Sequence, residues 1–336
     1  MPDIEAIKNH PVGIGEVLRA RSVIRPYLTP APMRHYPALS RLLGFEAYAK
    51  LENRNPGGCY KLRGGLNLVS RLASEGVRGV VTYSTGNHGL STASSARRFG
   101  LEAVVVVPEE SNPVKCRAIR DAGARLVESG ANFDEAGRKC AEIAEEHGHY
   151  FLHPANEPYL INGVATEFVE ILEDEPDIDV MIVPLGAGSE ASGAVTVFRA
   201  LKPDVEIIAV QAEAAPAARE SWKAGRILGA PNRTFAGGVA TGTAYEVPFG
   251  IYAGERGLDD FVLLSEEALY DGIALAAHHC RELLEGAGAA SLAAAFDLRA
   301  RLAGKKVAMQ FSGSNASPAE LAEAYGRRAL ETGEPD

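Results

Sequence analysis

The sequence predicts an α/β protein, and three observations lead to that prediction. Short runs rich in Val and Ile recur along the chain, and each is followed by a loop of small residues. An Ala-rich amphipathic segment follows most of these loops, which is the pattern of repeated β-α units. Several runs (VVVVP, MIVPL, EIIAVQ) are almost continuously apolar, as is typical of parallel strands that helices cover on both faces.

The expected strands are short β-branched runs, and most are separated by enough residues for a helix. In chain order they are Glu46–Leu51, Gly79–Tyr83, Ala103–Val107, Arg125–Glu128, Tyr150–Leu152, Val180–Leu185, Glu206–Gln211, Phe261–Leu264 and Lys306–Phe311.

The length of 336 residues suggests two domains or one large α/β unit. Pro and Gly cluster at Asn53–Gly58 and again at Pro154–Pro158. We therefore predict a small α/β domain of residues 55–154, inserted into a large domain of residues 1–54 and 155–336. Because ligands of such proteins bind outside the carboxyl ends of strands, the residues that follow strands are the candidates for a site.

Composition excludes several classes of function. The chain has 34 Lys and Arg against 44 Asp and Glu, a net charge of −10, so we expect no nucleic-acid partner. Its four cysteines contain no C-x-x-C pair, which favours a reducing compartment over a disulfide framework or a cysteine-zinc site. No apolar stretch is long enough for a membrane span or a signal peptide. We expect a cytoplasmic protein without a membrane partner.

A glycine-rich loop follows the strand Val180–Leu185. Its small residues Gly186, Ala187, Gly188 and Ser189 open a helix, where backbone N–H groups and the helix dipole favour a phosphate. The dinucleotide pattern G-x-G-x-x-G fails because the third glycine comes late, and no Walker lysine follows. The alternative is a tight strand-to-helix turn that binds nothing.

A second polar loop, Ser84-Thr85-Gly86-Asn87-His88, follows the strand Gly79–Tyr83 and also opens a helix. Its hydroxyls, amides and Asn87 form a group of donors suited to a carboxylate. Helix capping by Ser84 or Thr85 is the alternative interpretation.

Two further positions suggest carbonyl chemistry. Lys61 follows a Pro-Gly-Gly loop, and a lysine amine in a desolvated cleft can form a Schiff base with a carbonyl cofactor. Ser312 follows the last strand, where its hydroxyl would either meet a heterocycle nitrogen or cap the final helix. By itself, a lysine after such a loop is usually a solvated surface lysine, and the Schiff-base interpretation of Lys61 requires an electrophile.

Taken together, five motifs resemble the fold-type-II pyridoxal-phosphate enzymes, the family of threonine and serine dehydratases, serine racemases, cysteine synthases and the tryptophan synthase β chain. They occur in the family's order between about Thr29 and Asn315. The lysine motif K-x-E-x-x-N-P-x-G-S-F-K-x-R-G is matched by Lys50, Glu52, Asn55, Gly58, Lys61, Arg63 and Gly64. The others are Ser84–His88 for S-S-G-N-H, Gly186–Gly193 for the phosphate loop, Glu285–Ala289 for E-G-A-G-A, and Ser312–Asn315 for S-G-G-N.

The resemblance implies a tryptophan synthase β-like fold of two lobes, with three-layer open twisted sheets and the large domain binding pyridoxal 5′-phosphate. It implies that Lys61 forms the Schiff base and later removes the substrate Cα proton. Other cofactor contacts would be Asn87 at the 3′ oxygen, Ser312 at the pyridine nitrogen, and Gly186, Ala187, Gly188 and Ser189 at the phosphate. Substrate contacts would be Ser84, Thr85, Gly86, His88 and Gly238. We also expect a homodimer.

The chemistry of Ser312 favours one reaction type. A neutral hydroxyl opposite the pyridine nitrogen does not enforce a protonated ring, so loss of a β-substituent is favoured once the Cα proton is removed. We predict an ammonia-lyase that converts a β-hydroxy-α-amino acid, threonine or serine by default or a less common 3-hydroxy amino acid, to a 2-oxo acid and ammonia.

Three alternatives remain open. The first is a serine or hydroxyaspartate racemase, with Thr85 as the proton donor opposite Lys61, and the second is a β-replacing synthase. The third, from another class, is a nicotinamide oxidoreductase that uses the Gly186 loop.

Three departures from the family pattern affect the expectations. Cys59-Tyr60 replaces Ser-Phe before the lysine. Glu190 lies in the phosphate loop, and we expect its side chain to point away from a phosphate, in the first turn of the helix. Metal-activated relatives carry Glu and Asp where this chain has Gln211 and Ala217, so we predict no equivalent Mg²⁺ or Ca²⁺ site.

Overall fold

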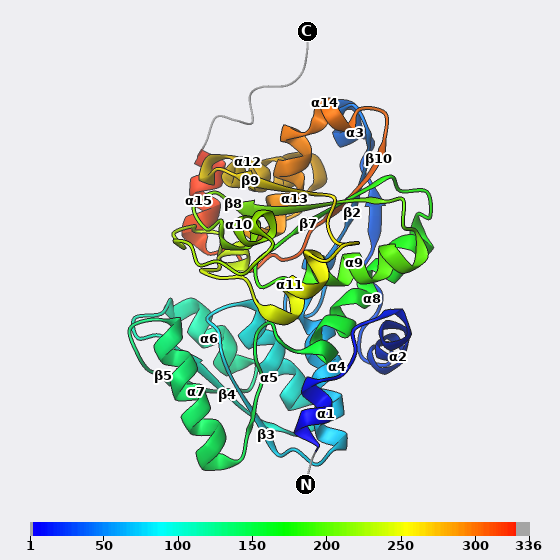
Figure 1. Ribbon diagram of the computed structural model, residues 1–336. Helices are drawn as coiled ribbons and strands as arrows, with labels where there is room; N and C mark the ends of the chain where they lie inside the picture. Colours follow the sequence, from blue (N-terminus) through cyan, green and yellow to red (C-terminus); the bar gives the residue numbers. More distant parts are fainter. Residues whose placement is uncertain (1–2, 327–336) are drawn as a thin grey trace. The chain divides into compact units, whose positions relative to one another are not determined.

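The computed structural model describes residues 3–326, which form two compact units (Figure 1). The first unit comprises Met1–Thr29 and Lys61–Thr166, and the second comprises Pro30–Tyr60 and the chain from Glu167 onward. Each unit has its own mainly parallel sheet with helices packed against it. The predicted α/β class is therefore confirmed.

The boundaries of the units differ from the expected insertion of residues 55–154. The amino-terminal 29 residues group with the small unit, because Ala20, Ile24 and Leu28 pack with Leu62 and Leu66 in one apolar cluster. The sequence shows that residues 20, 24 and 28 are apolar, but it does not show that they pack against the helix that carries Leu62 and Leu66.

The second unit contains a six-stranded sheet in the order β1-β2-β10-β7-β8-β9. All neighbouring strands are parallel except β1, which pairs antiparallel with β2. The strands are β1 (Met33–His35), β2 (Glu46–Lys50), β7 (Val180–Pro184), β8 (Glu206–Ala212), β9 (Asp260–Leu264) and β10 (Lys306–Gln310).

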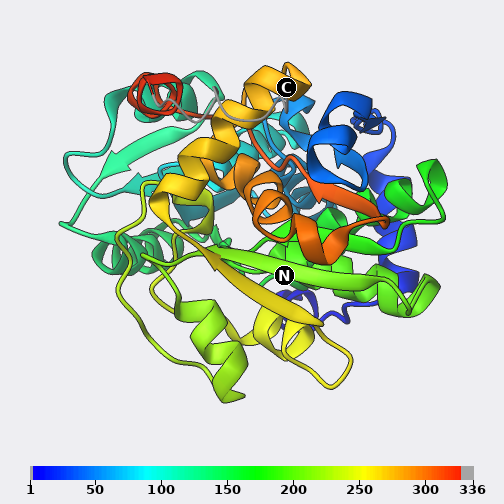
Figure 2. The ribbon, with the colours of Figure 1, turned by 90° about the horizontal axis from the view of Figure 1, so that it is seen from above.

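Helices cover both faces of this sheet, and Figure 2 shows α12 and α13 on one side of the strands and α10 and α11 on the other. The helices of this unit are α3 (Pro37–Leu43), α9 (Ser189–Leu201), α10 (Ala217–Ala224), α11 (Glu246–Tyr252), α12 (Glu266–Leu275), α13 (Gly286–Asp297), α14 (Arg299–Leu302) and α15 (Pro318–Gly326). Short 3-10 turns cover Glu52–Arg54 and Gly237–Val239, and a π-helical turn covers Ala276–Cys280.

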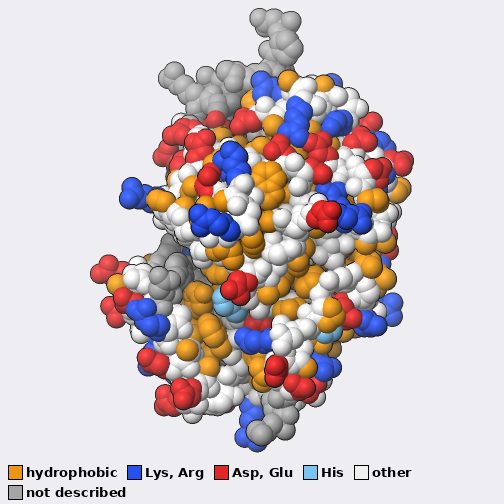
Figure 3. All heavy atoms as spheres, viewed as in Figure 1, with side chains coloured by type: hydrophobic (Ala, Val, Ile, Leu, Met, Phe, Trp, Pro, Cys, Tyr) orange, Lys and Arg blue, Asp and Glu red, His pale blue; other side chains and the backbone are white. Residues whose placement is uncertain are grey.

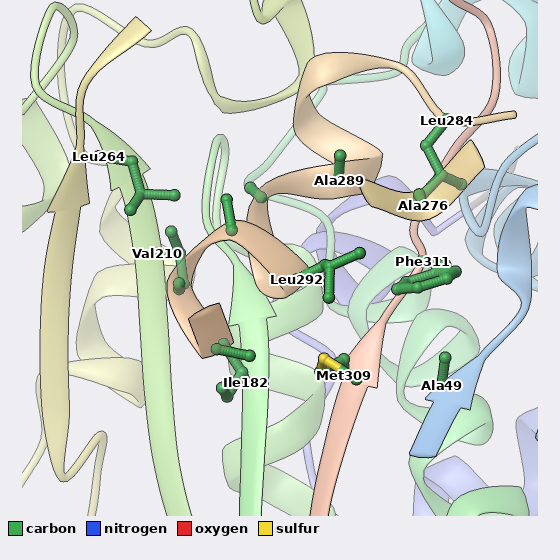
Figure 4. Close-up of a cluster of buried hydrophobic side chains, with 14 of the residues drawn as sticks. Ala49, Ile182, Val210, Leu264, Ala276, Leu284, Ala289, Leu292, Met309 and Phe311 are labelled. Carbon is green, nitrogen blue, oxygen red and sulfur yellow. The ribbon is translucent and has the colours of Figure 1, made fainter. Parts of the chain in front are cut away.

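The core of the second unit lies between the sheet and α13. Ile182, Val210 and Met309 project from three neighbouring strands toward Ala289 and Leu292 of that helix (Figure 4). Alternate residues of each strand contribute to this cluster, as expected for a strand that is covered on both faces. Because α13 consists largely of alanine and glycine, its backbone approaches the strands closely.

The first unit contains a four-stranded parallel sheet in the order β5-β4-β3-β6. Its strands are β3 (Gly79–Tyr83), β4 (Glu102–Val107), β5 (Arg125–Glu128) and β6 (Tyr150–Phe151). Its helices are α1 (Ile4–Lys8), α2 (Ile14–Ile24), α4 (Lys61–Ser74), α5 (Asn87–Phe99), α6 (Pro113–Asp121) and α7 (Phe133–His147). Helix α8 (Pro158–Asp174) begins in this unit and ends in the second.

All nine expected strands are present, with ends that agree within one residue. The strand that sequence reasoning missed is β1, which has three residues and lies at the edge of its sheet. Its Arg34 and His35 side chains are exposed, so β1 carries no apolar signal.

No helix among the described residues is long and apolar enough to cross a membrane. On the face shown in Figure 3, Lys and Arg side chains lie among Asp and Glu side chains instead of forming one basic patch.

A buried ion pair fixes the end of β2 in the second unit. Lys50 is fully buried, and its Nζ lies 2.8 Å from Oε2 of Glu170 on α8. The same ammonium donates a hydrogen bond of 2.6 Å to the Ala31 carbonyl. Asp174 lies 4.0 Å from Nζ but is half exposed, so Glu170 is the main counter-ion.

We predict that Glu170→Gln lowers the free energy of unfolding by about 3 kcal/mol, because it leaves the Lys50 charge buried without its main counter-ion. Asp174→Asn is the control, and its effect should stay below about 0.5 kcal/mol because the carboxylate is exposed. Urea unfolding of the three proteins checks this. Equal effects of both substitutions would show that Glu170 does not compensate the buried charge.

Candidate active site

The glycine loop after β7 leads directly into the amino terminus of α9. Gly188 precedes the helix with φ +96°, and no side chain caps this end. A Cβ on Gly186 would lie 2.0 Å from the Gly238 carbonyl oxygen, and one on Gly188 would lie 2.7 Å from Pro248 Cβ. The loop therefore requires glycine, and an uncapped helix terminus with close backbone access fits a phosphate group.

Backbone contacts tie the loop after β10 to the same region of the second unit. A Cβ on Gly238 would lie 2.5 Å from Ala287 Cβ, and one on Gly288 would lie 2.0 Å from the Gly313 carbonyl oxygen. The buried Ser312 hydroxyl lies 3.4 Å from the Ala287 carbonyl oxygen. The phosphate-loop candidate, Gly238 and Ser312 are thus joined through the E-G-A-G-A segment.

Tyr60, the residue before Lys61, is fixed to both loops of this unit. Its amide donates a hydrogen bond of 3.1 Å to the Ser312 carbonyl, and its hydroxyl lies 3.5 Å from Ser189 Oγ. Burial, together with the nearby charge of Glu190, raises the pKa of Tyr60 well above its ordinary value, so the phenol stays neutral. The tyrosine that departs from the family pattern therefore connects two of the predicted site residues.

Glu190 lies in the first turn of α9, as expected, and it is buried. Its carboxylate is close enough to raise the pKa of the Tyr60 hydroxyl. The structure thus places this acidic side chain near the phenol and not at the surface.

A buried carboxylate that sequence reasoning missed supports the turn before Lys61. Glu282 accepts a hydrogen bond of 2.8 Å from Asn53 Nδ2, and it also pairs with the Arg54 guanidinium. Ser314 Oγ donates a 3.1 Å bond to the Asn53 carbonyl. No local pattern marks Glu282, because its partners lie more than 200 residues earlier in the chain.

In the first unit, the loop after β3 forms the uncapped start of α5. Ser84 Oγ accepts a 3.1 Å hydrogen bond from the Gly86 amide, and no side chain caps the helix at Gly86. Thr85 lies between them, and Asn87 is the first helical residue. This arrangement leaves a helix amino terminus suited to a carboxylate.

Lys61 begins α4 beside this loop. Its carbonyl accepts a 2.7 Å hydrogen bond from Ser91 Oγ on α5. The two helices approach closely here, since a Cβ on Gly65 would lie 2.3 Å from Ser91 Oγ. The fold of the first unit therefore brings Lys61 near the predicted substrate-binding loop.

The His88 ring has a buried structural environment. Its Nε2 lies 3.0 Å from Thr82 Oγ1. Burial, with smaller effects from Lys61 and His153, lowers the pKa of His88 from 6.5 to about 3. The ring is neutral at physiological pH, so it supplies no positive charge for a carboxylate.

Among the side chains that the structure describes, no group of three or more His, Cys, Asp or Glu is arranged to hold a metal ion.

Comparisons with known proteins show which family this chain resembles. A family model described as pyridoxal-phosphate dependent enzyme matches residues 24–313. The L-threonine ammonia-lyase of Thermotoga maritima is 33% identical over 308 residues, which cover 90% of this chain and 76% of that protein. The crystal structure of a threonine deaminase from T.th. has a TM-score of 0.85 at 32% identity, covering 91% of this chain and 99% of that one. The structure of maize serine racemase has a TM-score of 0.87 at 27% identity, and the match covers 95% of this chain and 98% of that one.

The chain belongs to the family of pyridoxal-phosphate dependent enzymes. The predicted family, fold and cofactor are thereby confirmed, and the nicotinamide oxidoreductase alternative is wrong.

We predict that His88 makes the fold sensitive to acid. Because its pKa is lower in the folded than in the unfolded state, the unfolded chain binds the extra proton below pH 6.5. From this residue alone, the free energy of unfolding should be about 2 kcal/mol lower at pH 5 than at pH 7.5. Urea unfolding should show a weaker pH dependence for His88→Asn, whereas the exposed His147→Asn should behave like the wild type. An unchanged pH dependence in His88→Asn would contradict this account.

Proposed function

We propose that this enzyme is an ammonia-lyase that removes water and then ammonia from a β-hydroxy-α-amino acid, with L-threonine or L-serine as the default substrate. The observation that carries the proposal is the likeness to L-threonine ammonia-lyase over 90% of this chain. The site geometry supports it, because a neutral hydroxyl, Ser312, follows β10 and is joined to the glycine loop.

In the second unit, Gly186, Ala187, Gly188 and Ser189 would hold the cofactor phosphate through backbone amides and the Ser189 hydroxyl. The uncapped start of α9 supplies the matching partial positive charge. Ser312 would meet the pyridine nitrogen, and Gly238 would border the substrate side chain.

In the first unit, Lys61 would hold the cofactor covalently as a Schiff base, and Asn87 would bind its 3′ oxygen. Ser84, Thr85 and Gly86 would bind the substrate carboxylate at the uncapped start of α5. His88 would contribute its backbone amide only, because its ring is bonded to Thr82 and neutral.

When bound, pyridoxal phosphate supplies an electron-withdrawing ring that makes the substrate Cα–H acidic. The Lys61 amine would accept that proton. The Ser312 hydroxyl is neutral, so it does not hold a proton on the ring nitrogen as a carboxylate would. This favours departure of the β-hydroxyl over return of the proton to Cα. The water lost from the substrate is regained when ammonia is released, which leaves a 2-oxo acid.

A racemase is the second candidate, favoured by the likeness to maize serine racemase. It requires a proton donor on the face of Cα opposite Lys61, and Thr85 is the hydroxyl we assign to that role. A β-replacing synthase of the same fold would require a second substrate.

The remaining proposals concern the state of the protein in the cell. We propose a cytoplasmic homodimer whose partner is a small amino acid, with no nucleic-acid or membrane partner. The net charge of −10 supports the exclusion of nucleic acid. Light scattering of the purified holoenzyme should give twice the chain mass.

We predict that the purified holoenzyme has the visible absorbance of a lysine-bound cofactor, and that it releases ammonia and a 2-oxo acid from L-threonine or L-serine. Lys61→Ala should lack this absorbance band, and its activity should be at least about 1,000-fold lower, because Lys61 serves both as the attachment point of the cofactor and as the base. Lys223→Ala, an exposed lysine on α10, is the control that should retain both.

Racemisation of serine or 3-hydroxyaspartate without ammonia would refute the lyase and favour the racemase. Product formation only with an added nucleophile would favour the synthase. A visible band that persists in Lys61→Ala would refute the assignment of Lys61.

A further inference from the structure

Tyr60 contacts both loops of the second unit that are assigned to the cofactor. Its backbone is fixed to the loop after β10, because its amide donates a hydrogen bond of 3.1 Å to the Ser312 carbonyl. The preceding residue, Cys59, forms an antiparallel β-bridge with Gly313 of the same loop. The Tyr60 side chain therefore extends from a backbone of fixed position.

The Tyr60 hydroxyl reaches the other loop at the start of α9. Its oxygen lies 3.5 Å from Oγ of Ser189, which is the first residue of the helix and is fully buried. The preceding residues Gly186 and Ala187 are only partly buried, so this part of the loop has accessible surface for a ligand. The phenol thus contacts the buried end of a loop whose accessible part is assigned to the phosphate.

The Tyr60 phenol is neutral. Burial raises the pKa of Tyr60 well above its ordinary value, and the nearby charges of Glu190 and Glu167 raise it further. A neutral hydroxyl keeps the proton with which it can donate a hydrogen bond, whereas an ionised phenol beside this loop would repel a phosphate. Two of the departures from the family pattern, Tyr60 and Glu190, therefore lie near each other and act on the same hydroxyl.

We propose that the Tyr60 hydroxyl is a positioning group that holds the start of α9, and with it the glycine loop, in place for the cofactor phosphate. The inference rests on the proposed function, in which this loop binds the phosphate and Ser312 meets the ring nitrogen. Because one residue contacts both loops, Tyr60 fixes the spacing between the two ends of the cofactor site. The phenylalanine of the family pattern has no hydroxyl and cannot make the second contact.

Tyr60→Phe tests this role, because it removes the hydroxyl and keeps the ring and the backbone bond to Ser312. The full-length chain, freed of cofactor, would be titrated with pyridoxal phosphate and with pyridoxal, which lacks the phosphate, while the visible band is recorded. Tyr60→Phe should bind pyridoxal phosphate about 3- to 10-fold more weakly than the wild type, as expected for one lost hydrogen bond. It should bind pyridoxal with wild-type affinity, whereas a loss of general stability would weaken both.

Tyr252 on α11 provides a matched control. It is buried, and its Cε1 would lie 3.2 Å from a Cβ on Gly188, so it also packs against the glycine loop. Its hydroxyl has no hydrogen-bond partner among the described residues. Tyr252→Phe should therefore change neither affinity by more than about 2-fold.

A double-mutant cycle with Ser189→Ala assigns the effect to one contact. In the Ser189→Ala background, Tyr60→Phe should cause no further loss of affinity for pyridoxal phosphate, because the partner of the hydroxyl is already absent. Tyr60→Met, which also lacks the hydroxyl, gives a second test if Tyr60→Phe does not fold.

Four results would overturn this inference and leave the proposed function in place. They are wild-type affinity for pyridoxal phosphate in Tyr60→Phe, an equal loss of affinity for pyridoxal, the same weakening in Tyr252→Phe, and full additivity with Ser189→Ala. A wild type that forms no visible band with pyridoxal phosphate would overturn both the inference and the proposed function.

Discussion

Close approach of backbone to backbone in the second unit is the constraint on which the arrangement of the candidate site depends. Gly186 lies against the Gly238 carbonyl, and Gly288 lies against the Gly313 carbonyl, with no room for a Cβ at either position. These contacts join the loops after β7 and β10 through the start of α13. These glycine contacts fix the position of Ser312 relative to Gly188.

The residue before the predicted Schiff-base lysine is held by the same arrangement. Tyr60 bonds through its amide to the Ser312 carbonyl, and its neutral phenol lies beside Ser189. Farther from the lysine, Glu282 holds the Asn53 and Arg54 turn. For the anions of the proposed site, this acidic protein offers backbone amides, hydroxyls and helix termini, and its buried carboxylate Glu282 fixes a loop.

Much of the fold could be predicted from the sequence because its signals are local. Val-rich runs gave the strands of both sheets, and small residues after Pro184 and Tyr83 marked the two loops. The grouping of residues 1–29 with the small unit, the antiparallel β1 and the neutral environment of His88 could not be predicted. Each of these features depends on a contact that forms only in the folded protein, such as that of Ala20 with Leu62 or of His88 with Thr82. No pattern in the sequence indicates these contacts.

The affinity of Gly186→Ala for pyridoxal phosphate tests the central claim most directly, with Ala187→Gly as the matched change in the same loop. The close approach to Gly238 predicts binding at least about 10-fold weaker in Gly186→Ala, with circular dichroism of the wild type, and little change in Ala187→Gly. Wild-type affinity in Gly186→Ala would contradict the claim that glycine contacts between these loops build the cofactor site.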